Sequence, residues 1–451
     1  MKPPKSRKAE LAHNAMGGGD SHAEAAESAE LKMTELGPIP VDWEVKRFDE
    51  CFTLMRNNTY ARECLTDHSG SVANVHYGDI LVKYGAVLDF VKDSIPYLKP
   101  GVKPNKDLLK DGDIIFADTA EDETAGKAVE VQGMGDGKAV AGLHTVACRP
   151  NEGIFASRYL GYYINSVAYH SQLLPLMTGT KVSSVSRAGF VSTYLALPPL
   201  AEQRRIAGAL SDVDELISAL GKLIEKKRNI KTGAMQQLLP GKTRLPGFKG
   251  KWVEKRLGDC GSFSKGAGIS RAQANSGKIP AVRYGELYTT HHDYIKAFES
   301  FISDDVARES TKLTCGDIVF ACSGETKEEI GRCAAFLGEE AAYAGGDLII
   351  LSPKGEYDSK FLAFELNTPF CASQKAAAGQ GDAVVHIRRE SLEELVVRIP
   401  STLAEQKAIA AVLSDMDAEI AALEADRAKY ERIKSGMMQE LLTGKTRLKG
   451  E

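Results

Sequence analysis

The sequence lacks the features of a membrane protein, a secreted protein or a strongly charged one. No apolar run approaches the roughly 18–20 residues that a bilayer span needs. The positively charged start, residues 1–15, has no apolar stretch behind it, so no secretory signal is expected. The 451 residues carry a formal net charge of −4, which by itself gives no hint of a polyanionic partner. We therefore expect a cytoplasmic protein without membrane contact.

Metal-ligand spacing is also missing. The eight cysteines are scattered and include no CxxC pair. Cys315, Cys322 and Cys333 follow His291 and His292 in the chain, but their irregular spacing does not fit a structural zinc site. Free and mostly buried thiols in a cytosolic protein are the better interpretation, and no metal site is expected.

Catalytic motifs are absent in the same way. Gly241–Thr243 and Gly444–Thr446 resemble the end of a phosphate-binding loop, but Gln236 and Gln439 occupy the position of its first glycine. A helix stop is therefore expected at both places, and nucleotide binding is not. No G-x-S-x-G elbow, H-E-x-x-H motif or Asn/Asp-Pro-Pro-aromatic signature of an amino-methyltransferase occurs. We predict a chain without catalytic activity of its own.

The most informative feature that is present is an internal repeat. Segments 200–245 and 403–448 are identical at 26 of 46 positions, with a constant offset of 203. Weaker echoes lie between them, since Trp43…Lys46-Arg47 resembles Trp252…Lys255-Arg256, His76–Asp79 resembles Arg283–Glu286, and Asp113–Ala117 resembles Asp317–Ala321. The chain is also long enough for two to four domains, at roughly 100–200 residues each. The repeat predicts a variable unit, a shared unit, a second variable unit and a second shared unit.

These observations give the following expected boundaries. Residues 1–36 form an N-terminal extension, either flexible or a short helix, 37–199 and 246–402 are the variable units, and 200–245 and 403–448 are the shared units.

Both shared units read as long helices with one apolar seam. Their apolar residues recur at steps of four and three, the heptad spacing of a coiled coil. The expected seam residues are Ile206, Leu210, Val213, Ile217 and Leu220 in the first copy and Ile409, Leu413, Met416, Ile420 and Leu423 in the second. A helix with one apolar stripe needs a partner, so we expect the two copies to pack as an antiparallel coiled coil with pseudo-twofold symmetry.

The variable units mix strand-like and helix-like segments, and we predict an α+β fold for each. Residues 114–117, 317–320 and 348–351 are expected strands, and residues 158–170 and 359–366 are expected helices.

Their polar loops carry side chains suited to DNA. Arg, Asn and Gln pair with base edges in the major groove, and Ser, Thr and Lys suit phosphates, although the same composition also occurs in ordinary solvated loops. The candidate DNA-binding residues are Arg56, Asn57, Asn58, Tyr60, Arg62, Thr180, Lys181, Ser184 and Arg187 in the first unit and Lys265, Arg271, Gln380, His386 and Arg388 in the second.

With these motifs in place, the chain resembles the specificity (S) subunits of type I restriction-modification systems. The most telling residues are Pro198–Gln203 and Leu403–Gln406 ahead of the helices, and Met235–Leu239 and Met438–Leu442 at their ends. The resemblance covers nearly the whole chain from about Leu36.

The resemblance implies two target-recognition domains, each reading half of a bipartite site in double-stranded DNA, and two helices that set the gap. It also implies two docked methyltransferase subunits, and motor-nuclease subunits in the complete restriction enzyme. These partners, and not this chain, would hold S-adenosylmethionine, ATP and Mg²⁺. The expected host is a bacterium or an archaeon.

Two alternatives stay open at this point. One is the recognition part of a methylation or phage-defence complex without restriction, and the other is a coiled-coil scaffold. The charge of the separate units does not exclude DNA: residues 201–245 carry +4 and residues 404–448 carry −1. Since no unit is basic enough to hold DNA by charge alone, tight binding is expected to need the complex.

Overall fold

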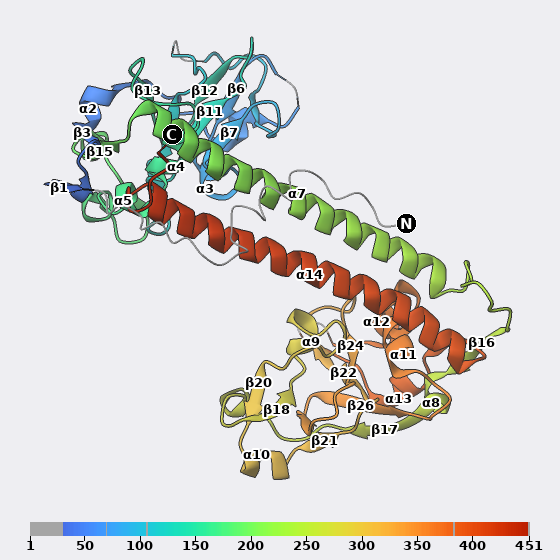
Figure 1. Ribbon diagram of the computed structural model, residues 1–451. Helices are drawn as coiled ribbons and strands as arrows, with labels where there is room; N and C mark the ends of the chain where they lie inside the picture. Colours follow the sequence, from blue (N-terminus) through green and yellow to red (C-terminus); the bar gives the residue numbers. More distant parts are fainter. Residues whose placement is uncertain (1–29, 69, 105–106, 382–383, 450–451) are drawn as a thin grey trace. The chain divides into compact units, whose positions relative to one another are not determined.

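The computed structural model describes residues 30–68, 70–104, 107–381 and 384–449. It divides into two compact units, of which unit 1 contains residues 1–218 and 429–451 and unit 2 contains residues 219–428. Two 39-residue helices, α7 (Leu200–Leu238) and α14 (Leu403–Leu441), each begin in one unit and end in the other (Figure 1). They confirm the two long helices predicted from the repeat. No helix in the described ranges has the length and apolar character that a membrane span requires.

A five-stranded sheet forms the centre of unit 1. Its order is β4 (Phe52–Leu54), β13 (Thr145–Pro150), β9 (Ile114–Ala117), β11 (Ala128–Gln132) and β7 (Val87–Asp89). Successive side chains of a strand point to opposite faces. Ile114 and Phe116 therefore pack into one hydrophobic cluster, and Ile115 and Ala117 pack into another. The strand predicted at residues 114–117 is confirmed.

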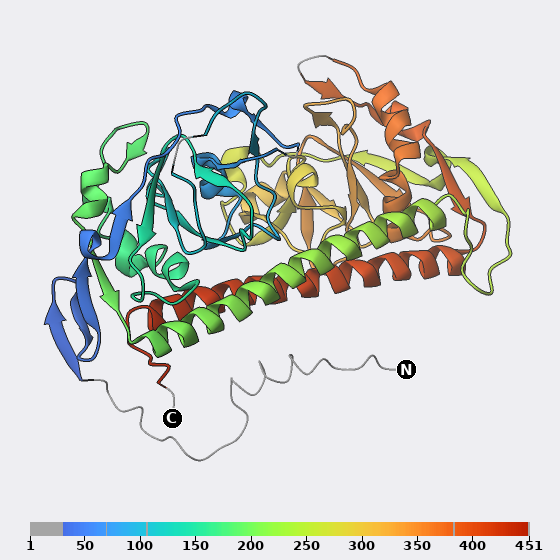
Figure 2. The same cartoon turned by 90° about the horizontal axis from the view of Figure 1, so that it is seen from above.

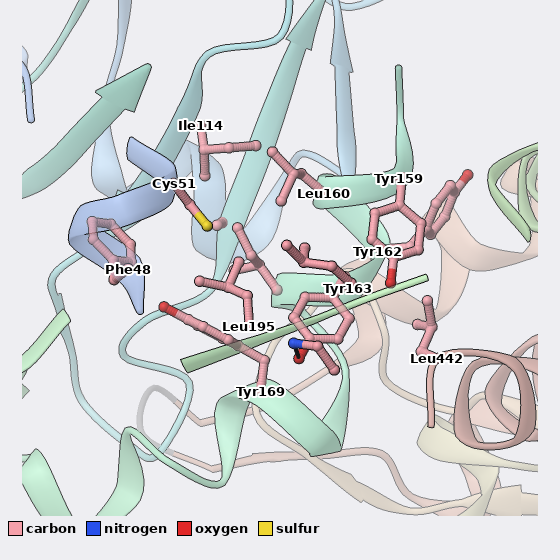
Figure 3. Close-up of a cluster of buried hydrophobic side chains, with 14 of the residues drawn as sticks. Phe48, Cys51, Ile114, Tyr159, Leu160, Tyr162, Tyr163, Tyr169, Leu195 and Leu442 are labelled. Atoms are coloured by element: carbon pink, nitrogen blue, oxygen red, sulfur yellow. Dashed lines mark hydrogen bonds between the residues drawn. The ribbon is translucent and has the colours of Figure 1, made fainter. Parts of the chain in front are cut away.

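Helices and the ends of α7 and α14 cover one face of this sheet. Tyr159, Tyr163 and Tyr169 gather there, and Leu442 reaches the same cluster from the chain's other end (Figure 3). The elements are α2 (Phe48–Cys51), α4 (Tyr159–Ile164), α5 (Val167–His170), the 3-10 turn η2 (Leu174–Leu176) and α6 (Arg187–Val191).

The single helix predicted at residues 158–170 is wrong, because the chain breaks between α4 and α5. Asn165 turns its side-chain amide to the carbonyl oxygen of Ala128 in β11, at 2.7 Å. Ser166 then caps α5, since its hydroxyl accepts a hydrogen bond from the backbone N–H of Tyr169. These two side chains replace the hydrogen bonds that a continuous helix would have made.

Smaller sheets complete unit 1. The other face of the five-stranded sheet packs on a four-stranded sheet, whose order is β12 (Ala139–Ala141), β6 (Ala73–Val75), β8 (Tyr97–Leu98) and β5 (Leu65–Thr66). The remaining elements are the pairs β3 (Glu44–Arg47) with β15 (Tyr194–Leu197) and β10 (Thr119–Ala120) with β14 (Ser183–Ser184), the helix α3 (Tyr77–Val82) and the 3-10 turn η1 (Arg62–Cys64).

The expected N-terminal extension differs from the structure at its end. Residues 31–40 form a hairpin of β1 (Leu31–Thr34) and β2 (Gly37–Pro40), drawn in blue at the edge of unit 1 in Figure 2. Ile39 is buried in the core, so the hairpin is attached to the domain and is neither a flexible tail nor a helix. Residues 1–29 lie outside the described residues, and the expectation for them stays a prediction.

Unit 2 repeats the five-stranded sheet with the same connectivity. Its order is β17 (Gly261–Lys265), β26 (Leu348–Pro353), β22 (Ile318–Ala321), β24 (Cys333–Ala335) and β19 (Asp293–Tyr294). The strands predicted at residues 317–320 and 348–351 are confirmed, and so is the helix at residues 359–366, which is α11 (Ser359–Leu366). The α+β prediction therefore holds for both variable units.

The two units differ in the fourth strand of the smaller sheet. In unit 2 the order is β20 (Ser300–Ile302), β18 (Ile279–Val282), β25 (Ala342–Ala344) and β21 (Thr311–Leu313). Thus β21 extends the β25 edge, whereas β5 of unit 1 extends the opposite, β8 edge. The remaining elements are β16 (Trp252–Arg256) paired with β28 (Val396–Pro400), β23 (Ser323–Gly324) paired with β27 (Val385–His386), the 3-10 turn η3 (Arg271–Gln273), α8 (Leu257–Cys260), α9 (Glu286–Thr289), α10 (Asp304–Arg308), α12 (Pro369–Ala378) and α13 (Arg389–Glu393).

The predicted helix seam divides between two environments. Ile206 and Leu210 are fully buried in the core of unit 1, and Ile409 and Leu413 are buried in the core of unit 2. The start of each seam therefore attaches its helix to a domain and does not face the other helix alone. Farther along, Ile420 is buried and the others are half-buried: Val213, Ile217, Leu220, Met416 and Leu423.

Ion pairs join the two helices within each unit. In unit 2, Lys227 contacts Glu419 at 2.6 Å and Lys231 contacts Asp417 at 2.8 Å. The residue number rises along α7 while that of its partner falls along α14, as expected for antiparallel helices. In unit 1, Lys434 near the end of α14 contacts Asp214 near the start of α7 at 2.6 Å. Each unit thus contains an antiparallel pair of helix segments.

A buried ion pair closes unit 1 between the two repeats. Glu202, at the start of α7, is 2% exposed and accepts two hydrogen bonds from the guanidinium of Arg447, at 2.7 and 2.6 Å. Arg447 also binds Asp42 and lies over the ring of Trp43, whose Nε1 donates to Glu202 at 3.3 Å. The two carboxylates raise the pKa of Arg447.

Unit 2 has the matching pair with the repeats exchanged. Arg244, which follows α7, donates two hydrogen bonds of 2.6 Å to Glu405 at the start of α14 and lies over Trp252. Gly241 has a φ of +68°, and a Cβ there would come within 2.9 Å of the Trp252 ring. The repeated Gly-Lys-Thr-Arg sequence is therefore a helix stop that ends in an ion pair, as predicted.

Replacing Arg447 should destabilise unit 1 strongly. Arg447→Met keeps the apolar contact but leaves the buried Glu202 carboxylate without its cation, which costs about 3–5 kcal/mol. At roughly 2–4 °C per kcal/mol, the thermal unfolding midpoint should fall by on the order of 10 °C.

Arg256→Met is the matched control. Arg256 pairs with Glu394 on the surface, where the side chains are 64% and 63% exposed. An exposed pair contributes about 0–1 kcal/mol, so this variant should unfold close to the parent temperature. Equal falls in calorimetry for both variants would contradict the role given to Arg447.

Candidate nucleic-acid interface

The candidate loops of unit 1 gather at one edge of its five-stranded sheet. Strand β4 ends there at Leu54, β13 begins there at Thr145, and β9 ends there at Ala117, because these neighbouring strands are antiparallel. The loop of residues 55–62 follows β4. The hairpin of residues 178–184 joins the same edge, since β14 pairs with β10 directly after β9.

Arg187 holds the two loops together. Its Nη2 atom donates to the backbone oxygen of Met55 and to Oδ1 of Asn57, both at 3.1 Å. Asn57 in turn donates to the backbone oxygen of Gly142 at 3.1 Å. Two segments about 130 residues apart in the sequence therefore form one surface.

The hairpin of residues 178–184 has a tight, exposed tip. Thr178 and Ser184 exchange backbone hydrogen bonds of 3.0 and 2.9 Å. Gly179 has a φ of +111°, and a Cβ there would lie 2.0 Å from the backbone oxygen of Val182. Only glycine fits this position, and the turn leaves Thr180 and Lys181 exposed while Ser184 is half-buried.

Two of the predicted cations already have carboxylate partners. Arg56 binds Asp107 through two hydrogen bonds of 3.1 Å, which lower the pKa of that carboxyl. Arg62 contacts the buried Asp79 at 2.6 Å. Both guanidinium groups stay exposed, but the neighbouring carboxylates cancel much of their positive charge at the surface.

The loop after β4 contains one correction. Asn58 is only 1% exposed, so its expected place on a solvated surface is wrong. Its backbone N–H donates to Ala141 at 2.8 Å and ties the loop to β12, which draws the residue inward. The hydroxyl of Tyr60 donates to the backbone oxygen of Lys103 at 2.9 Å, bringing the loop 99–104 to this surface.

Unit 2 builds the same edge from the matching strands. Strand β17 ends at Lys265, β26 begins at Leu348 and β22 ends at Ala321. Gln380 and His386 exchange backbone hydrogen bonds of 2.9 and 2.8 Å, as Thr178 and Ser184 do in unit 1.

His386 and three other predicted residues lie on this surface. The Nδ1 atom of His386 lies 3.0 Å from the hydroxyl of Ser323 in the strand β23. Gln380 and Arg388 are exposed at the two ends of the hairpin, and Arg271 is exposed in η3. All five residues predicted for unit 2 are therefore exposed, with Lys265, Gln380 and His386 at the sheet edge and Arg271 in the groove beside it.

Several side chains at these edges were not predicted. In unit 1, His144 lies 3.7 Å from Asp118 and packs edge-on against Tyr77, with 5.2 Å between ring centroids. In unit 2, Arg283 and Tyr284 occupy the positions of His76 and Tyr77. The repeated His76–Asp79 and Arg283–Glu286 segments were a signal for them, but each segment alone reads as an ordinary strand end.

The absence of a metal centre stays a prediction. No group of three His, Cys, Asp or Glu side chains within the described ranges could hold a metal ion. All eight cysteines are free, and five of them are buried: Cys51, Cys148, Cys260, Cys333 and Cys371. Burial raises the pKa of the Cys51 and Cys260 thiols to about 11, which keeps both protonated and unreactive at neutral pH.

Comparison with known proteins places these edges in context. The family model for the type I restriction modification DNA specificity domain matches residues 40–229 and 249–434. The MjaX type I restriction enzyme specificity subunit of Methanocaldococcus jannaschii is 26% identical over 442 residues, covering 93% of this chain and 97% of that protein. The MjaVIII specificity subunit of the same organism is 27% identical over 291 residues, covering 60% of this chain and 66% of that protein.

Solved structures share the fold. The S subunit of a type I restriction-modification system from M. genitalium has a TM-score of 0.55 at 15% identity, with 88% of this chain and 96% of that chain covered. A chain from a study of complex assembly and conformational transition of the type I R-M system also has a TM-score of 0.55, at 18% identity, with coverage of 90% and 99%. Since the family model matches most of the sequence, twice, this chain belongs to the type I restriction-modification DNA specificity family and is a non-catalytic, DNA-recognising specificity subunit.

Proposed function

We propose that each variable unit reads one half of a bipartite DNA site from the major groove. The observation that carries this proposal is that exposed polar loops meet at the same sheet edge in both units. Matched positions carry unlike side chains: Arg56 corresponds to Lys265, and Ser184 corresponds to His386. Unlike donors and acceptors favour unlike base pairs, so the site should be asymmetric.

The two long helices set the spacing between the half-sites. At 1.5 Å per residue, a helix of 39 residues is roughly 58 Å long. Two readers in successive major grooves need a separation of about 34 Å, which such a spacer can supply. The antiparallel ion pairs within each unit support a continuous antiparallel coiled coil with pseudo-twofold symmetry.

The same helices dock two methyltransferase subunits, and motor-nuclease subunits complete the assembly. S-adenosylmethionine, ATP and Mg²⁺ belong to these partners in the cytoplasm of a bacterium or an archaeon. The near-neutral charge of this chain supports a requirement for partners, because tight binding to DNA depends on neutralising many phosphates.

Methylome sequencing tests the proposal. The full chain is co-expressed with its methyltransferase in a host without other methylation, and methylated positions are mapped by single-molecule sequencing. We expect one bipartite, asymmetric motif with a fixed gap. A complex that forms but methylates no bipartite motif would exclude the recognition role, and binding without a salt-dependent DNA component would favour a scaffold.

The two hairpins and their loops should act on separate half-sites. Lys181→Ala should weaken binding to the full site by about 1–3 kcal/mol. It should weaken binding by the same amount when only the second half-site is scrambled. Lys265→Ala should do the same for the second half-site. Titrations against duplexes with one half-site scrambled check this, and equal dependence of both variants on both halves would contradict two independent readers.

Arg187 should stiffen the first reading surface. Arg187→Ala removes its two hydrogen bonds, and at about 0.5–1.5 kcal/mol each the hairpin of residues 178–184 should open roughly tenfold more often. Hydrogen-exchange mass spectrometry measures this as faster exchange in the hairpin with unchanged exchange in β9. Thr180→Ala, at the exposed tip, is the control and should leave hairpin exchange unchanged; faster exchange there too would remove the special role of Arg187.

A further inference from the structure

Unit 2 contains a groove beside its reading edge, and Arg271 is the one candidate DNA-binding residue in the groove lining. It has a volume of about 390 Å³ and lies between the loop after β17 and the turn that joins β25 to β26. Its walls carry Ser270, Arg271, Gln273, Arg283, Tyr284 and Asp347, with glycines 268, 345 and 346 between them.

Two arginines of this groove have no acidic partner among the residues that the structure describes. Arg271 is exposed and Arg283 is half-buried, and neither guanidinium makes an ion pair or side-chain hydrogen bond within the part of the chain that the structure describes. Arg62 of unit 1 is the matched residue, because Arg62 and Arg271 each begin the 3-10 turn after the first strand of the sheet. Arg62, however, is neutralised by Asp79 at 2.6 Å.

The difference has a local cause. Glu286 of unit 2 occupies the place of Asp79 and is equally buried. It accepts hydrogen bonds from the hydroxyl of Ser300 and from the backbone N–H of Arg283, the latter at 3.3 Å, and lies 3.4 Å from Nε2 of His291. Because the Glu286 carboxylate is bonded to these groups and not to Arg271, the Arg271 guanidinium remains available to a ligand.

The backbone of the groove wall is fixed in an unusual conformation. Ile269 has a φ of +58°, which a β-branched residue rarely adopts, and its side chain is anchored in a core with Ala281 and Ile302. Gly345 and Gly346 also line the groove, and the backbone N–H of Gly346 donates to the backbone oxygen of Gly268 at 2.9 Å, which joins the two loops of the groove.

We propose that this groove binds one phosphodiester of the DNA backbone beside the second half-site, an inference that rests on the proposed function. Arginine binds phosphate through paired hydrogen bonds, and tyrosine and serine hydroxyls add donors of the kind that phosphates accept. The carboxylate of Asp347 disfavours the binding of a second phosphate in the same groove, because the two negative charges repel each other.

The groove also adjoins the residues expected to read bases. The backbone oxygen of Asp347 accepts a hydrogen bond from Cys322 at 3.1 Å, and the next residue, Ser323, contacts His386 of the hairpin. Lys265 ends the strand that leads into the groove wall. A phosphate held here therefore positions the second half-site for its reader.

Salt dependence tests the proposal directly. The full chain is assembled with its methyltransferase, and its affinity for a duplex carrying the mapped motif is measured across NaCl concentrations. Arg271→Gln and Arg283→Gln should each make the slope of log K against log[NaCl] shallower, and the double variant should make it shallower by about 1, because the two arginines share the charge of one phosphate. Arg271→Lys keeps the charge and should keep the slope.

Arg308→Gln is the matched control. Arg308 lies in the same domain, is exposed and pairs with Asp305 outside the groove, so its loss should leave the slope unchanged. Both groove arginines lack described side-chain partners, so the variants should unfold at the parent temperature. A double variant with the parent slope would overturn the proposal.

Methylphosphonate scanning then locates the contact. Neutralising one phosphate beside the second half-site should weaken binding by the parent complex and have no effect on the double variant. If 7-deazaguanine in the motif abolishes the effect of the arginines instead, the groove reads a base and the phosphate site is excluded. A parent complex without sequence-specific, salt-dependent binding would instead overturn the proposed function itself.

Discussion

The exchanged ion pairs at the helix ends are the contacts on which the rest of the structure depends. Glu202 and Glu405 are buried carboxylates, and each is neutralised by an arginine that follows the helix of the other repeat. A buried charge without a partner lowers the stability of the fold. Each domain is therefore stable only when the arginine of the other repeat is in place. Each domain therefore contains the start of one repeat and the end of the other.

The residue after each glutamate extends the same attachment into the domain. Gln203 accepts a hydrogen bond from the backbone of Ala156 at 2.9 Å, and Gln406 accepts one from Asp358 at 2.8 Å. Ile206 and Ile409, one turn later, are buried in the two cores. Each helix start is thus fixed to its domain by charge, amide and apolar contacts, which gives the loops at the sheet edge a rigid support. Precise support matters because base reading tolerates little displacement of the donor atoms.

On this common support the two units differ in how the arginines near the sheet edge are paired. Unit 1 neutralises Arg56 with Asp107 and Arg62 with Asp79, and adds the aromatic rings of Tyr77 and His144. Unit 2 leaves Arg271 and Arg283 without described acidic partners. If each unit reads one half-site, as proposed, the two halves can be held by different balances of base contacts and phosphate contacts, although the two five-stranded sheets have the same strand order.

The sequence by itself determined the repeat, the two long helices, the α+β character of the variable units and the family. These features depend on local periodicity and on residues that recur at a constant offset, which a linear sequence records directly. It did not reveal the break at Asn165, the attached hairpin of residues 31–40, the burial of Asn58 or the part played by Arg283 and Tyr284. Those outcomes depend on contacts between residues far apart in the chain, such as Asn165 with Ala128, which only the tertiary structure decides. The partition of arginines into neutralised and available ones was decided in the same way, because a charge is cancelled by whichever carboxylate the fold brings within about 3 Å.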